Sequence, residues 1–426
     1  MTGGQVSLSF NALRQRIADC ETGRSAQQSA ALWFDRDFLC VDVTSATCLD
    51  LRLTDNQPRH PKIGEKLKFS FKSQGRCRKD AVLLLATVAF LLCLAPRLLA
   101  QAADTERPIP ILTGNAGFFT HVNGGKSELV PEIHPVILFP IGNRWLIEAR
   151  GEFEAEFERP DGGGAYRGKV DKGLDYLQAD FIANRYVTIT GGRFLTPFGI
   201  YNERLYPIWI RSLTNEPLIF PLGTGSSDGV MLRGGFALSP KVNLNYASYF
   251  STLSTVNKFE ADRKIGGRIG FFLPGQRIEA GASWQKLLQE ERPNSFGFHF
   301  AWQPIPLPLN LRSEYVRSNE GSGYWLEAAY RLSQLRLWNK VMRRTEIVGR
   351  AQQLFAGTIS EEEAYQYGLP DVNTRQGEFG INYYLHDGLK ATASYGRRFS
   401  KDGNLNVWTV GIAYRFVFPL ARLGSR

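Results

Sequence analysis

Cysteine is missing from most of this sequence. All five cysteines of the 426 residues lie before residue 94, at Cys20, Cys40, Cys48, Cys77 and Cys93. The longer, later part of the chain therefore cannot be stabilised by disulfides. Long apolar runs are missing from the same part. After residue 110 no stretch approaches the 18 consecutive apolar residues of a transmembrane helix, which excludes a helical membrane protein there.

Histidine is also scarce. The five copies are scattered, with no paired spacing of the kind that binds zinc, and lie at His60, His121, His134, His299 and His386. We therefore expect no metal, no other cofactor and no catalytic residues, and we expect that the protein is not an enzyme.

The positive charge does not indicate a nucleic-acid partner. The whole chain carries 51 Lys+Arg against 41 Asp+Glu, a net of +10. Residues 1–102 hold 14 of these bases and 9 of the acids, which leaves 37 and 32, a net of +5, for the rest. We expect no nucleic-acid binding.

A secretory signal peptide is predicted over residues 76–102. Arg76, Arg78 and Lys79 form its positive region, and an apolar core of 15 residues runs from Ala81 to Ala95. Ala100-Gln101-Ala102 matches the small-x-small cleavage pattern, so cleavage is expected near Ala102. The alternative is a buried helix. The protein is thus predicted to be exported.

Residues 1–75 precede this signal and show no repeated hydrophobic face. We expect them to be disordered, and to result from a start codon placed too far upstream, with the true start near Leu67. The alternative is an atypical leader. Residues 103–426 then form one domain.

Period-2 alternation dominates that domain. In "SFGFHFAWQ", Phe296, Phe298, Phe300 and Trp302 alternate with small or polar residues. The segments 145–158 and 408–418 follow the same pattern. Such segments are typical of strands with one apolar and one polar face.

The connections predict the architecture. Seven mostly short ones alternate with eight that are mostly longer, near 121–129, 159–173, 197–228, 252–263, 288–294, 319–322, 356–373 and 400–404. Fifteen connections imply sixteen strands, although fourteen or eighteen stay open. Short turns facing the periplasm and longer loops facing outward are typical of outer-membrane barrels. We predict an all-β, closed antiparallel transmembrane barrel. The alternative is a soluble all-β protein.

The same alternation identifies the residues that face the lumen. Lys390 is predicted inward, and so are these arginines: Arg233, Arg268, Arg312, Arg331, Arg350, Arg398 and Arg415. The inward glutamates are Glu148, Glu152, Glu154, Glu156, Glu279, Glu314, Glu327 and Glu378. Many of these charges are expected to pair along the wall.

One segment resembles a known family. "GGRFLTPFGIYNE" is similar to the R-x-x-x-P-F-G-like turn of the phosphate-selective porin O/P family, at Arg193, Pro197, Phe198 and Gly199. "GYWLEAAYRL" (323–332) and "GEFGINYYLHDGLKATASYGRRF" (377–399) resemble later strands of that family. The resemblance implies a sixteen-stranded, usually trimeric channel for small anionic or polar solutes, inserted by the barrel assembly machinery.

The sequence departs from the family in two respects. Phe418, where the barrel would end, is followed by "PLARLGSR". The lumen also mixes charges, whereas the phosphate-selective members depend on stacked arginines and lysines, so phosphate selectivity is not carried over.

The loop predicted over 197–228 is the third on its side and the longest in the chain. Ordering about thirty residues is entropically costly unless they pack. Prolines stiffen it, and Tyr201, Tyr206, Trp209 and Phe220 could anchor it to the wall. We expect it to fold into the pore. The alternative is a mobile surface lid.

The predicted function is that of a porin in a Gram-negative outer membrane, which passes small hydrophilic, including phosphate-like anionic, solutes. The residues expected at the constriction are Arg193, Glu203, Arg204, Arg211 and Glu216. The pore wall is expected to include Arg233, Arg268, Arg312, Arg331, Glu148, Glu152 and Glu154.

Three alternatives stay open. The first is a substrate-specific channel for organic acids or sugars, with Tyr201, Tyr206 and Trp209 as a slide. The second is an outer-membrane enzyme with His299 as a catalytic base. The third is a structural barrel or adhesin with a plugged lumen.

Overall fold

The computed structural model describes residues 109–420, except 160–163, 224, 253–260, 290–292, 336–337, 358–363 and 365–367. The predicted signal peptide 76–102 and the segment 1–75 lie outside the described residues, so both stay predictions.

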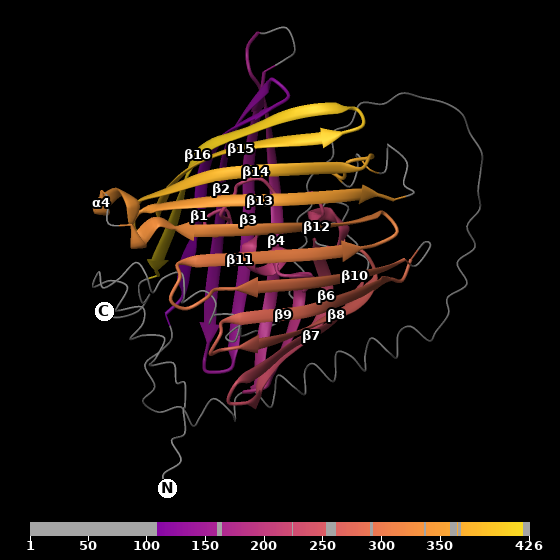
Figure 1. Ribbon diagram of the computed structural model, residues 1–426. Helices are drawn as coiled ribbons and strands as arrows, with labels where there is room; N and C mark the ends of the chain where they lie inside the picture. Colours follow the sequence, from indigo (N-terminus) through magenta and orange to yellow (C-terminus); the bar gives the residue numbers. More distant parts are fainter. Residues whose placement is uncertain are drawn as a thin grey trace, which may run out of the picture. The chain divides into compact units, whose positions relative to one another are not determined.

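Antiparallel strands of the described part close into a single barrel (Figure 1). Each strand pairs with the next in chain order, and β1 completes the ring by pairing with β16. The sixteen strands are β1 (Ile111–Asn123), β2 (Lys126–Ile141), β3 (Trp145–Glu158), β4 (Arg167–Asn184), β5 (Val187–Leu195), β6 (Ser226–Ser239), β7 (Val242–Thr252), β8 (Lys264–Leu273), β9 (Ile278–Leu287), β10 (Asn294–Trp302), β11 (Leu309–Arg317), β12 (Gly321–Arg331), β13 (Thr345–Ala356), β14 (Thr374–His386), β15 (Leu389–Ser400) and β16 (Gly403–Pro419). The predicted closed antiparallel barrel is confirmed.

Helical structure in the described residues is confined to connections. Between β5 and β6 lie a π-helical turn, η2 (Tyr201–Leu205), and a 3₁₀ turn, η3 (Phe220–Leu222). Between β12 and β13 lie η4 (Leu332–Gln334) and α4 (Asn339–Met342). None of these helices is long and apolar enough to cross a membrane.

The burial of the strand residues follows the predicted alternation. In β10, Phe296, Phe298 and Phe300 are exposed, whereas the intervening residues His299 and Ala301 are buried. A closed sheet has one outer and one inner face, so this apolar face is the outer one and the polar face lines the interior. Phe416 differs from the other aromatics of its strand because it is buried opposite Gly114 of β1.

Two predicted connections are much shorter than expected. The connection predicted near 121–129 is a two-residue turn, Gly124–Gly125, with positive φ angles of 59° and 93°. Glycine pairs adopt this hairpin turn without steric cost, so the strands run on to the turn. Likewise β4 begins at Arg167, inside the connection predicted over 159–173, because strand pairing continues through its charged residues.

Candidate functional site: the barrel interior and its long loop

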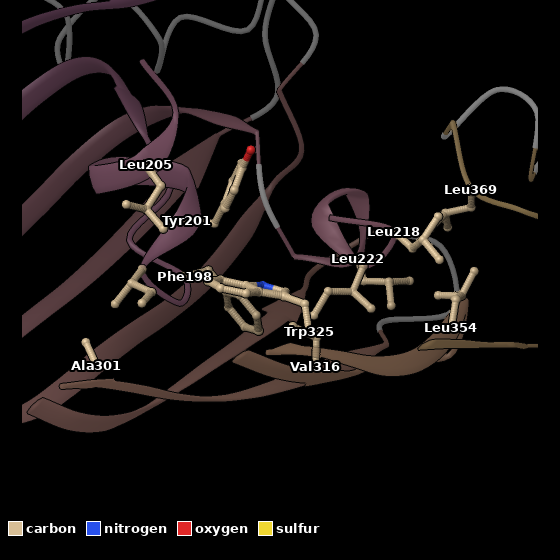
Figure 2. Packing of buried hydrophobic residues seen from close by; sticks show 12 residues of the cluster. Phe198, Tyr201, Leu205, Leu218, Leu222, Ala301, Val316, Trp325, Leu354 and Leu369 are labelled. Atoms are coloured by element: carbon tan, nitrogen blue, oxygen red, sulfur yellow. The ribbon is translucent and has the colours of Figure 1, made fainter. Parts of the chain in front are cut away.

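The connection between β5 and β6, residues 196–225, is here called the long loop. It packs against the inner face of the wall through a cluster of buried apolar residues (Figure 2). The loop contributes Phe198, Ile200, Tyr201, Leu205, Leu218, Ile219 and Leu222. The wall contributes Ala301, Val316, Trp325 and Leu354, joined by Leu369 from the β13–β14 connection. This burial offsets the entropy of ordering the loop.

The turn Phe198-Gly199 begins this packing. Gly199 has a φ of 63°, which glycine adopts readily. A β-carbon at that position would meet the carboxylate of Glu314. Glycines also make room for the Phe198 ring, because a β-carbon at Gly297 would lie 2.8 Å from it. The local sequence therefore lets the backbone approach the wall closely.

Glu314 of β11 receives the loop as it leaves this turn. Its carboxylate accepts hydrogen bonds from the backbone N–H groups of Ile200 and Tyr201, the latter at 2.9 Å. The indole N–H of Trp325 also donates to it, at 3.0 Å. A carboxylate with several donors can stay buried, so Glu314 holds the start of η2 on the wall.

Charged side chains tie η2 to the neighbouring wall. Glu203 pairs with Arg268 at 2.6 Å and with Arg233 at 3.2 Å. Burial by itself would raise the pKa of Glu203, but the guanidinium groups of Arg268, Arg233 and Arg204 together lower it below 4.5. Glu203 is therefore held as a carboxylate between cations.

More ion pairs extend this network around the wall. Arg204 of the loop pairs with Glu279 at 2.7 Å, and Glu279 lies 3.6 Å from His299. Arg312 pairs with Glu327 at 3.3 Å and Arg350 pairs with Glu378 at 3.0 Å. All of these wall residues are buried.

The far side of the loop reaches β14 and β15. The Lys390 ammonium group donates to the carbonyl oxygens of Ile208, Trp209 and Arg211, at 3.2, 3.2 and 2.7 Å. The amide of Asn382 donates to the Ser212 carbonyl at 2.8 Å. An ammonium group has three protons, so Lys390 uses its full capacity on the loop backbone.

Tyr206 makes the contacts of the long loop with β3 and β4. Its ring lies 4.6 Å from the guanidinium carbon of Arg150, which pairs with Asp175 at 2.9 Å. The Nη2 atom of Arg150 lies 2.7 Å from Nδ1 of His134. Because arginine only donates, Nδ1 is the acceptor. The loop thus contacts wall residues on opposite sides of the barrel.

The structure brings together part of the predicted site. Glu203 and Arg204 contact the wall as described, and Arg233, Arg268 and Arg312 are among the wall residues of the network. Arg211 and Glu216 pair with each other at 3.0 Å within the loop. Tyr201 and Phe220 are anchors, with ring centroids 5.1 Å apart.

Other predicted site residues lie elsewhere. Arg193 pairs with the wall residue Asp228 at 3.1 Å and is positioned by β5 and β6. Arg331 lies over the Tyr384 ring, 4.0 Å from its centroid, beside the β12–β13 connection. Glu148, Glu152 and Glu154 all lie on β3, on the face that also carries Arg150.

Sequence reasoning missed two contacts that fix the loop. Trp325 is 1% exposed and lies at the centre of the apolar cluster (Figure 2). Trp325 lies two residues before Glu327, so strand alternation assigns it to the same inner face. The sequence alone could therefore have shown that it faces the loop. Arg150 alternates with Glu148 and Glu152 and so shares the face of the glutamates predicted inward, but its contact with the Tyr206 ring depends on the tertiary path of the loop.

Two alternatives for the interior concern a metal site and the role of His299. No group of three or more His, Cys, Asp or Glu side chains among the residues described could hold a metal ion. The side chain of His299 is fully buried, which leaves its imidazole no access to a lipid substrate. Its predicted alternative role as a base receives no support.

Comparisons with known proteins give structural similarities only. No family model matches the chain. No curated protein matches it either. Three solved structures illustrate the similarity. OprB of Pseudomonas putida, at low pH, is 8% identical with a TM-score of 0.48, over 72% of this chain and 93% of that chain. OmpF of Salmonella typhi, in complex with daunomycin, is 11% identical with a TM-score of 0.49, over 72% and 97%.

The third is an anion-selective porin from Comamonas acidovorans. It is 12% identical with a TM-score of 0.46, over 72% of this chain and 99% of that chain. At such identities and scores the function of this chain has to be inferred from its own geometry.

Proposed function

We propose that this protein is a porin of a bacterial outer membrane, through which small hydrophilic solutes diffuse passively. One observation carries the proposal: the closed barrel has an apolar outer face, and its polar interior is narrowed by an ordered loop. Bilayer hydrocarbon requires a closed sheet with every backbone group paired. An interior of sixteen strands is wide enough for water.

The exposed apolar face supports the membrane location. Val410, Ile412, Phe379 and Phe298 are each about half exposed, although none of them is in a loop. Leaving the exposed half of such side chains in water would cost about 1 kcal/mol each, whereas lipid chains would cover it. Outer-membrane lipid is therefore the partner of this face, with the short turns on the periplasmic side.

The loop contacts define the constriction. Glu203, Arg204, Arg211 and Glu216 are retained as constriction residues, and Arg193 is left out because it pairs on the strands. Tyr201 is 4% exposed and Tyr206 covers Arg150, so these rings serve as anchors and not as an aromatic slide.

The single-channel conductance of the refolded protein in a planar bilayer tests this proposal. We expect discrete, ohmic openings. A second candidate is a barrel closed by its loop, which the contacts of the loop with opposite walls favour. A silent wild type that conducts once the loop is loosened would support that candidate. A lumen that never conducts would refute the porin.

Export and assembly complete the proposal. We infer that the signal peptide 76–102 is cleaved near Ala102, that the barrel assembly machinery inserts the barrel, and that three copies associate. N-terminal sequencing of the protein extracted from membranes tests the first inference. Sedimentation in detergent tests the trimer.

A further inference from the structure

The charges of the barrel interior divide into two regions. Around the apolar cluster, the bases Arg204, Arg233, Arg268, Arg312 and Arg350 all lie within 3.3 Å of a carboxylate. Lys390 is used by three loop carbonyls. Each of these arginines keeps at most 15% of its side-chain surface and has a carboxylate partner, and Lys390 is buried against the loop backbone, so they attract solute anions only weakly.

The inner faces of β2 and β3 are different. Glu132, Glu152, Glu154 and Glu156 are here called the acidic wall. Glu132 and Glu154 are direct partners across the two strands. Like charges directly opposite each other destabilise a strand pair. The fold therefore keeps an arrangement that is unfavourable by itself.

The acidic wall is poorly neutralised. Glu154 is surrounded by Glu132, Glu152, Glu156 and Glu128, and within the described part of the chain no cation lies within 4 Å of its carboxylate. Glu152 and Glu156 keep about a third of their side-chain surface, 27% and 33%. The paired carboxylates of the other side, Glu203, Glu279, Glu327 and Glu378, keep 11% at most.

The bases near the acidic wall do not neutralise its carboxylates. Arg150 pairs with Asp175 and is covered by the Tyr206 ring. Lys169 contacts Asp171 and lies 4.0 Å from Glu156. His134 is buried, and its Nε2 atom lies 3.2 Å from Glu132 and 3.8 Å from Glu152 without a well-formed hydrogen bond.

We infer that the channel prefers small cations, and that Glu152, Glu154 and Glu156 set this preference. The inference rests on the proposed porin function. On one side, Glu203 of the loop and the wall carboxylates neutralise the bases. On the other side, Glu152 and Glu156 keep part of their side-chain surface in contact with water. Rings and walls of carboxylates raise the local concentration of cations and exclude anions. Four of the arginines that the sequence placed inward are paired with carboxylates in the structure: Arg233, Arg268, Arg312 and Arg350. The others contact rings or an amide: Arg331, Arg415 and Arg398. The anionic, phosphate-like solutes expected from the sequence therefore lose most of the charges that would bind them.

The reversal potential in a KCl gradient tests this inference. We expect the wild type to give a cation-to-anion permeability ratio above one. The triple variant Glu152→Gln, Glu154→Gln, Glu156→Gln should bring this ratio to one or below it, and Glu154→Gln alone should shift it in the same direction. Asp371→Asn, Asp387→Asn, Asp402→Asn removes the same charge from exposed turns and should leave the ratio unchanged.

The dependence of the permeability ratio on salt concentration provides a second test. The Debye length is about 10 Å at 0.1 M salt and about 3 Å at 1 M, so the preference should fade as the salt is raised. Anion preference in the wild type, or a ratio unmoved by the triple variant, would overturn the inference and leave the porin intact. A lumen that does not conduct in the wild type or in variants with a loosened loop would instead refute the porin.

Discussion

At the residue scale, glycine controls how closely the long loop approaches the wall. Gly199 combines a positive φ with a β-carbon position that the Glu314 carboxylate occupies. Glu314 is also the acceptor for the first N–H groups of η2. A single added methyl group therefore acts on both the turn and its anchor.

We expect Gly199→Ala to loosen the loop. Overpacking of this kind destabilises by about 1–3 kcal/mol, here directed against the docked loop. Single-channel conductance should rise and become noisier. Gly275→Ala is the control, because a β-carbon there meets open space. Equal conductance of the two variants would show that the turn does not fix the loop.

The stability of the docked loop depends on pH through Glu203. Its pKa is lowered below 4.5 in the docked loop, so its ion pairs contribute stability above pH 4.5. That contribution is lost only as the pH falls through the lowered pKa. Glu203→Gln removes it at every pH.

We therefore expect Glu203→Gln to conduct more than the wild type at pH 7. The difference should persist down to pH 4.5 and shrink below it, as the wild type loses the same charge. Conductance titrations of both proteins measure this. A difference that disappears well above pH 4.5 would contradict the assignment.

At the scale of elements, the loop is held by a wall residue from a distant strand. Trp325 of β12 packs on Tyr201 with ring centroids 6.1 Å apart and donates to Glu314. Because the cluster joins η2 and η3 to several strands, Trp325 couples the two ends of the loop.

Trp325→Ala should release this coupling. Truncation of a buried tryptophan costs about 3–5 kcal/mol. We expect higher conductance and a lower temperature for the heat-induced shift in gel mobility. Trp408→Ala removes an equally large ring from the exposed outer face and should leave the conductance unchanged. An unaltered conductance in Trp325→Ala would exclude the anchor.

At the scale of the whole molecule, the outer face of the barrel is apolar, so the barrel requires an apolar surrounding such as the hydrocarbon of a bilayer. Phe298 lies at the middle of β10 and is 56% exposed. An arginine at the bilayer midplane destabilises a transmembrane barrel by about 2–4 kcal/mol.

Phe298→Arg should therefore lower the stability of the barrel in lipid vesicles by about that amount. Urea titration followed by tryptophan fluorescence measures it. Gln276→Arg, in the turn between β8 and β9, is the control and should be near neutral. Equal stability of both variants would argue that lipid does not cover this face.

The sequence by itself determined the barrel. Alternation along segments such as "SFGFHFAWQ" fixes which side chains share a face, and the chain folds into consecutive hairpins because its turn residues lie between such segments. The sequence also placed Arg233, Arg268 and Arg312 inward. It overestimated the β1–β2 connection, because Gly124 and Gly125 adopt positive φ angles and close that hairpin in two residues.

Only the tertiary structure decided which charged side chains of the inner face remain open to solutes in the lumen. Alternation places Glu154 and Glu314 on the same inner face, yet one lies among other carboxylates and the other receives three N–H donors. The difference arises because the loop crosses the interior and meets residues more than a hundred positions away. No local period encodes such contacts. They follow from the closure of the barrel, which brings the distant strands to the same loop.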